Sequence, residues 1–166
     1  MGTSHQTAKV YFNKLSLIQF AFIGGIVILI GGFCVYLNLL SATGDTHKYS
    51  SSGFMFLVPI SVIIAIVQTN YTFKTKLGSV RNGTNLKAKM IGYKELVVVR
   101  SAVLSGPCFM VMAALARTNN IDYLLYVVFL VGILIIKRPT IKLAVAELGL
   151  NQEQTAKLKD PNSLLT

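Results

Sequence analysis

The strongest constraint on this chain is residues 15–40, an apolar run without a single charged side chain. At the rise of an α-helix the run covers roughly 39 Å, more than the roughly 30 Å hydrocarbon core of a bilayer. Three further apolar runs follow, interrupted only by Arg100 and, near the start of the last one, by Asp122: residues 53–70, 96–116 and 121–136. The chain is therefore predicted to be an all-α membrane protein with four transmembrane helices.

The composition agrees with this class. Hydrophobic residues make up 53% of the 166 residues and charged residues only 13%, whereas soluble domains carry roughly 25% charged residues. A secretory signal peptide has a shorter apolar region, of about 7–15 residues, so the first run is interpreted as an uncleaved anchor.

The basic residues predict the orientation. All lysines and arginines except Lys48 and Arg117 precede the first run, lie between the second and third, follow the fourth, or are Arg100. An even number of spans places these segments on one side, and the positive-inside rule makes that side cytoplasmic. We expect residues 1–14 and 138–166 in the cytoplasm, flanking a transmembrane domain at residues 15–137.

The net charge of +10 suggests an anionic partner. Basic patches are also the footprint of nucleic-acid binding, but no recognition module accompanies them here. Anionic lipids of the cytoplasmic leaflet are therefore the expected partner. The basic residues predicted to contact their headgroups are Lys74, Lys76, Arg81, Lys87, Lys89, Lys137, Arg138 and Lys142.

Two cytoplasmic segments show helical periodicity. Apolar residues recur at helical spacing on both sides of an Asn-Gly turn signal at residues 82–83. Spans two and three are therefore predicted to extend beyond the bilayer as a helical hairpin. After Pro139, Ile141, Val145 and Leu148 mark one face of a short amphipathic helix along the inner surface, with Gly149 as its C-cap and Asn151 starting one further turn.

Small residues predict how the spans associate, because hydrophobicity does not drive helices together in lipid. Span one carries Ala21, Gly25 and Gly32 along one stripe. This stripe suits either packing within the chain or dimerisation. Span four has Gly132 as its one glycine, so spans one to three are predicted to form the packed core and span four to be the most exposed to lipid.

Arg100 is the first candidate for a functional residue, because ionisable residues within a span are costly. The alternative is that its long side chain reaches the headgroups or makes a structural bond. Gln68, Asn70 and Tyr71 are the partners expected on span two.

Two prolines are candidates for helix kinks. Pro107, in Ser105-Gly106-Pro107, is expected to leave the carbonyl of Val103 without its helical partner, and Ser101 or Ser105 to compensate. Pro59 is expected to bend span two. Two facing kinks open a polar pocket in some transporters, although a structural kink is the simpler interpretation.

The sequence offers no other chemistry. No paired carboxylates, phosphate-binding loop or nucleophile motif occurs. Cys34 and Cys108 lie in apolar runs and are interpreted as small buried hydrophobes. We therefore expect no catalytic residue, bound metal or cofactor, and no enzymatic activity.

Two stretches resemble small uncharacterised four-helix membrane proteins of Bacteroidota: Arg100, Ala102, Gly106 and Pro107 in span three, and Arg138-Pro139-Thr140 followed by Ala146-Glu147-Leu148 after span four. The resemblance implies the four-span architecture and supplies no activity. This chain departs from the family pattern at Ser105, where the family favours glutamate, so a carboxylate that could pair with Arg100 inside the span is missing.

Taken together, the residue patterns and the resemblance favour a structural or accessory subunit of a membrane complex in a bacterial inner membrane. A small oligomeric transporter or channel component is the alternative, and an enzyme of lipid metabolism is a third, less supported one. Either a homo-oligomer or a hetero-complex with other membrane proteins is compatible with the sequence.

Overall fold

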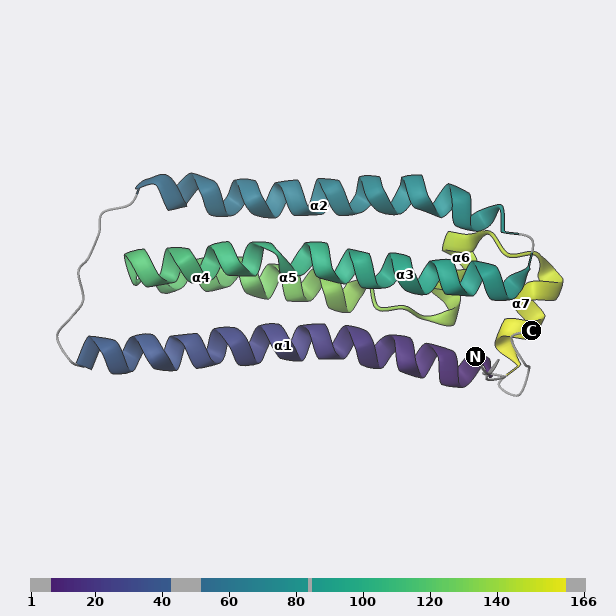
Figure 1. Cartoon of the computed structure of the whole chain (residues 1–166), viewed down its shortest axis with the longest axis horizontal. Helices are drawn as coiled ribbons and strands as arrows, with labels where there is room; N and C mark the ends of the chain where they lie inside the picture. The colour runs from purple at the N-terminus through teal and green to yellow at the C-terminus, as the bar shows by residue number, and fades with distance from the viewer. Residues whose placement is uncertain (1–6, 43–51, 84, 161–166) are drawn as a thin grey trace. The chain divides into compact units, whose positions relative to one another are not determined.

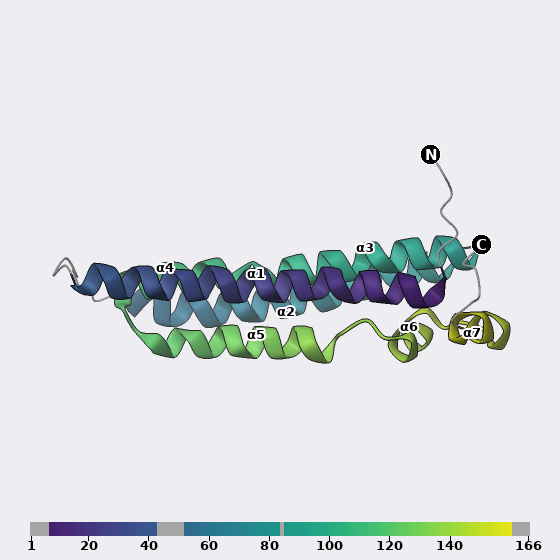
Figure 2. The ribbon, with the colours of Figure 1, turned by 90° about the horizontal axis from the view of Figure 1, so that it is seen from below.

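The computed structural model describes residues 7–42, 52–83 and 85–160, and no β-strand occurs among them. Figures 1 and 2 show the order of the helices. They are α1 (Ala8–Ala42), α2 (Ser52–Arg81), α3 (Leu86–Ser105), α4 (Pro107–Thr118), the 3₁₀ helix η1 (Ile121–Tyr123), α5 (Leu124–Ile136), α6 (Ile141–Leu148) and α7 (Gln152–Lys159). The predicted all-α class is confirmed.

Three helical stretches are long and apolar enough to cross a membrane: Ala8–Leu39, Gly53–Arg81 and Leu86–Thr118. The stretch Ile121–Ile136 passes the same test only when it is joined to α6 across a bend. By length and composition, the described part of the chain thus contains three helices suited to crossing a membrane, or four if the bent pair is one span.

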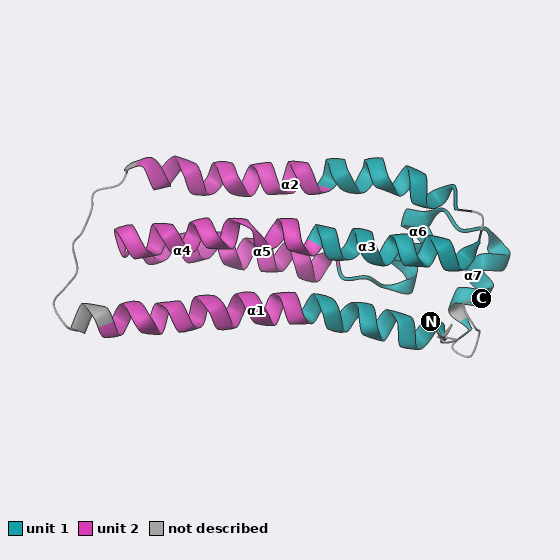
Figure 3. Cartoon of the chain, viewed as in Figure 1, with its two compact units in different colours: residues 1–20, 70–100, 138–166 teal, residues 21–69, 101–137 magenta. Residues whose placement is uncertain are grey.

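The described chain divides into two compact units, coloured in Figure 3. Unit 1 comprises residues 1–20, 70–100 and 138–166, and unit 2 comprises residues 21–69 and 101–137. The first part of α1, the last part of α2 and most of α3 belong to unit 1, together with α6 and α7. Each unit has a hydrophobic core of its own.

The core of unit 1 is built by the amphipathic segments that the sequence identified. Five helices contribute the buried side chains of this core, which are Ala8, Tyr11, Phe12, Leu15, Leu77, Leu86, Met90, Tyr93, Leu96, Val97, Ala144, Leu148 and Leu158. In the hairpin formed by α2 and α3, a methyl group of Val80 lies 2.7 Å from the position that a Cβ atom on Gly92 would occupy. The absence of a side chain at residue 92 therefore lets the two helices approach closely, and the helices predicted on both sides of the Asn-Gly turn are confirmed.

The caps of α6 and α7 follow the sequence signals. The Thr140 side chain accepts a hydrogen bond from the Leu143 amide, and Gly149 ends α6 with a left-handed φ of 60°, a conformation that glycine adopts without strain. Asn151 caps α7 through the Gln154 amide. Instead of resting only on a lipid surface, α6 buries Ala144 and Leu148 completely in the core of unit 1, because that core offers its apolar face a protein partner.

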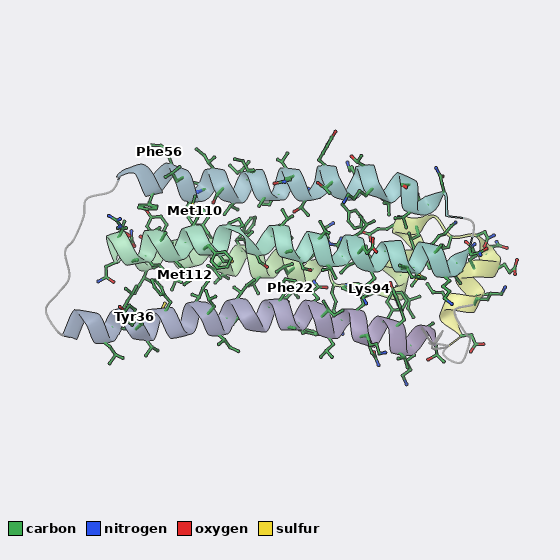
Figure 4. All side chains as sticks on the ribbon, viewed as in Figure 1. Phe22, Tyr36, Phe56, Lys94, Met110 and Met112 are labelled. Carbon is green, nitrogen blue, oxygen red and sulfur yellow. The ribbon has the colours of Figure 1, made fainter. Side chains whose placement is uncertain are left out.

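The core of unit 2 contains side chains from α1, α2, α3, α4 and α5. Figure 4 labels Phe56, Met110 and Met112 on these segments, and Lys94 on the part of α3 in unit 1. The expected ranking of the spans is wrong. In the apolar window of α1 only 11% of the residues are buried, against 44% in the window of Leu86–Thr118, while α5 buries Val127, Leu130 and Leu134.

The short connection after α4 explains this difference. Asn119 takes a left-handed conformation, and the Asn120 side chain accepts a hydrogen bond from the Asp122 amide. So tight a turn brings α4 and α5 together as neighbours, as the sequence predicts. At the α1 glycines within unit 2, Gly24, Gly25, Gly31 and Gly32, no other helix places an atom within 4 Å of where a Cβ atom would lie, so close packing of the α1 stripe within the chain is not observed.

Candidate functional site

The candidate site surrounds Arg100, the last residue of α3 in unit 1. The side chain of Arg100 is only 6% exposed, and its Nη1 lies 3.5 Å from Oε1 of Glu147 on α6. The guanidinium carbon also lies 4.7 Å from the centre of the Phe73 ring on α2. A charge buried to this degree needs a partner, and unit 1 supplies both a carboxylate and an aromatic face.

Glu147 accepts hydrogen bonds from two further residues. The Tyr93 hydroxyl donates to Oε2 of Glu147 over 2.8 Å, and Nε of Arg81 donates to the backbone carbonyl of Glu147 over 2.7 Å. Glu147, Arg100, Tyr93, Arg81 and Phe73 are hereafter called the Glu147 cluster. It connects α2, α3 and α6 within unit 1.

Helical spacing places these residues together. Tyr93 and Arg100 are seven residues, about two turns, apart on α3 and so share a face. Phe73 and Arg81 are eight residues apart on α2, so their directions differ by about 80° around the helix. Glu147 lies on α6 between the buried residues Ala144 and Leu148. Packing of the apolar face of α6 into the core therefore carries the carboxylate to the hairpin.

The electrostatics keep Tyr93 protonated. Burial raises the pKa of the Tyr93 hydroxyl above its ordinary value, and the negative charge of Glu147 together with the hydrogen bond raises it further. Burial also raises the pKa of Tyr11, whose hydroxyl donates to the Met90 carbonyl over 2.5 Å. Both phenols thus act as hydrogen-bond donors that fix helices in unit 1, and the arrangement as a whole holds α6 and α1 on the hairpin.

Arg100 makes the contacts described above with Glu147 and Phe73, which are not the partners expected from the sequence. Asn70 and Tyr71 are exposed, and so is Gln68, which belongs to unit 2. Sequence reasoning missed Glu147 and looked for a carboxylate inside the span instead. One sequence feature could have predicted this partner: Glu147 is the one acidic residue in the amphipathic helix α6, and it lies beside the apolar face.

The segment at Ser105-Gly106-Pro107 interrupts the helix as predicted, since α3 ends at Ser105 and α4 begins at Pro107. The Ser105 hydroxyl donates to the Ser101 carbonyl over 2.7 Å. Pro107 has no amide hydrogen to donate to the Val103 carbonyl, as predicted. The amide of Gly106 donates to this carbonyl over 3.2 Å instead, so a tighter turn, and not a serine side chain, replaces the missing bond.

Pro59 lies within α2 without interrupting it. Two residues later, the Ser61 hydroxyl donates to the Val58 carbonyl over 2.7 Å. The second proline thus leaves the helix continuous from Ser52 to Arg81.

Most of the basic residues predicted to contact lipid have exposed side chains. Lys74, Lys76, Lys87, Lys137 and Lys142 are exposed, and Lys89 is half-buried. Two arginines of this set are held by the protein: Arg81 by the Glu147 carbonyl, and Arg138 by Ser16 and Phe20 of α1.

Metal ligands do not gather in the described parts of the chain, where no group of three or more His, Cys, Asp or Glu residues could hold an ion. Cys34 is half-buried and Cys108 is buried, and both are free thiols.

No protein-family model, curated protein or solved structure matches this chain. The resemblance to membrane proteins of Bacteroidota therefore stays a prediction.

Proposed function

We propose that this chain is a four-span protein of a bacterial inner membrane, with both termini in the cytoplasm. It acts as a non-enzymatic structural or accessory subunit of a membrane complex, and unit 1 is the part that contacts the partner. The proposal depends on one observation: nearly all charged residues belong to unit 1, and unit 2 is almost uncharged.

The distribution of charge supports this placement. Every lysine and arginine except Lys48, Arg117 and Lys137 belongs to the residue ranges of unit 1, as does every acidic residue except Asp45 and Asp122. The helical segments 21–42, 52–69 and 101–118 of unit 2 are roughly 18 to 22 residues long, which suits a hydrocarbon core of about 30 Å. The last segment, 121–136, is shorter and covers roughly 24 Å. Unit 2 therefore has the dimensions and polarity of a transmembrane domain.

The geometry of α2 supports a protein partner for the far end of unit 1. From Asn70, where unit 1 takes over α2, to Arg81 the helix runs roughly 17 Å. Screening in the cell limits electrostatic attraction to about 8 Å. If α2 stands steeply in the bilayer, Lys87 and Lys89 beyond its end are out of reach of the headgroups, which revises the expectation for these two residues.

The alternative is a small oligomeric transporter or channel component. The observation in its favour is the low burial of α1, of whose apolar window only 11% is covered by the chain. A second copy could cover this surface, although lipid covers it equally well.

Two measurements test the proposal. In spheroplasts, a membrane-impermeant maleimide should label the variant Asn119→Cys and leave Asn82→Cys unlabelled, both made after replacing Cys34 and Cys108 by alanine. Labelling of residue 82 from outside would contradict the topology.

Mass determination in lipid nanodiscs cut directly from the membrane separates the two functions. A hetero-complex that dissociates in Lys87→Glu/Lys89→Glu, but not in the control Lys74→Glu, supports the accessory role. A symmetric homo-oligomer supports the alternative, and a monomer contradicts both.

A further inference from the structure

Arg138 is an exposed arginine that the protein holds in a fixed orientation. It is the first residue of unit 1 after the apolar helix α5. Its Nε donates to the hydroxyl of Ser16 over 3.1 Å, and its guanidinium carbon lies 5.0 Å from the centre of the Phe20 ring. Ser16 itself is only 7% exposed, so this anchor is part of the packed unit.

The anchor leaves most of the guanidinium unused. An arginine has five N–H donors in a planar fork, and Ser16 occupies the one on Nε. Within the described ranges 7–42, 52–83 and 85–160, no residue accepts a hydrogen bond from Nη1 or Nη2 and no carboxylate pairs with them. The outer edge of the fork, which matches two oxygens of a phosphate group, is therefore available.

The surroundings favour an anion. The sequence has no acidic residue before Asp45 and none between Asp122 and Glu147, so neither α1 nor the chain around Arg138 offers a carboxylate nearby in sequence. Lys137 and Lys142 add positive charge on either side. The Phe20 ring beside the weakly hydrated guanidinium of Arg138 also suits a position at the boundary between the headgroups and the hydrocarbon core.

We propose that Arg138 binds the phosphodiester of an anionic phospholipid in the cytoplasmic leaflet, with both oxygens held by Nη1 and Nη2. The site rests on the proposed topology, which places the end of α5 and the start of the apolar part of α1 at the headgroups. A free phosphate ion has the same chemistry, so the test must separate the two sources.

The test measures lipid binding to the purified full chain in detergent. The probes are a short-chain phosphatidylglycerol, the corresponding phosphatidylcholine and inorganic phosphate, followed by native mass spectrometry and a thermal shift. Arg138→Lys retains the charge but loses the fork. Arg117→Gln removes a comparable charge from another exposed position and serves as the control.

We expect Arg138→Lys to raise the Kd for phosphatidylglycerol at least tenfold, and the control Arg117→Gln to raise it less than twofold. Ser16→Ala, which removes the anchor but not the arginine, should raise it by a smaller factor, about two to five, since fixing the side chain lowers the cost of binding. This second variant keeps the test valid if a substitution at residue 138 disturbs folding.

Three results would overturn the inference: no measurable binding of phosphatidylglycerol, equal binding by the wild type and Arg138→Lys, or equal losses in Arg138→Lys and Arg117→Gln. Competition by micromolar inorganic phosphate would assign the site to the free ion instead of the lipid. Maleimide labelling at residue 82 is independent of Arg138, so failure of the lipid site and failure of the proposed topology give different results.

Discussion

Replacing Glu147 by alanine tests whether the Glu147 cluster holds α6 on the hairpin. The substitution leaves Arg100, which is 6% exposed, without its carboxylate and removes the acceptor of the Tyr93 hydroxyl. Breaking a buried ion pair costs about 3–5 kcal/mol, and a lost hydrogen bond about 1 kcal/mol. The Arg100–Glu147 distance of 3.5 Å and the 16% exposure of Glu147 reduce the first cost, so we expect about 3 kcal/mol in total.

Hydrogen exchange followed by mass spectrometry measures this cost locally. A loss of about 3 kcal/mol should make the amides of α6 exchange roughly a hundredfold faster through local opening. Amides of α5, in unit 2, should keep their rates. Glu147→Gln keeps an oxygen for the Tyr93 hydroxyl, and should therefore have a smaller effect than Glu147→Ala.

The chain contains a matched control. Glu153 forms an ion pair with Lys157 on α7, but both side chains are mostly exposed, and such pairs contribute little. Glu153→Gln should therefore leave the exchange of α6 unchanged. Indistinguishable exchange rates of α6 in Glu147→Ala and Glu153→Gln would refute the reasoning. A double variant with leucine at residues 100 and 147 provides a second test, because an apolar pair replaces a buried ion pair at little cost. A double variant less stable than either single variant would also refute the reasoning.

Two further predictions concern unit 1. Gly92→Ala should lower the stability of unit 1 by about 1–3 kcal/mol in denaturant titrations, because a methyl group of Val80 lies 2.7 Å from the new Cβ position. The control Gly78→Ala should not lower the stability, because nothing lies within 4 Å of its Cβ position. Adding Val80→Ala to Gly92→Ala should restore the stability. The pKa of both Tyr11 and Tyr93 is raised above the ordinary 10.0, so the stability they contribute is complete below pH 10 and is lost as the pH rises above it. Replacing both by phenylalanine should flatten this alkaline loss of stability, and an unchanged pH dependence would contradict the assignment.

Local physical chemistry made much of this fold predictable. Long uncharged runs identify helices because an apolar helix satisfies its own backbone and needs no particular partner. Gly149 and Asn151 mark helix ends because caps depend on one or two adjacent residues. The positions of Leu77, Met90 and Tyr93 on a buried face follow from helical periodicity alone.

Pairs of residues far apart in the chain were not predictable in the same way. Arg100 and Glu147 are 47 residues apart, and the sequence provides several basic residues with which a single glutamate could pair. The choice depends on how the apolar face of α6 packs, which no local pattern specifies. The burial of the spans was likewise misjudged from glycine content, because small residues permit close packing without saying which helix approaches.

The sequence by itself determined the helical class, the apolar stretches and most helix ends, since each of these is decided by the residues within a few turns. Only the tertiary structure decided that α6 packs into unit 1, that Arg100 meets Glu147 and that Arg138 is anchored by Ser16. These contacts join segments separated by dozens of residues, and their geometry comes from the simultaneous packing of several helices around one core.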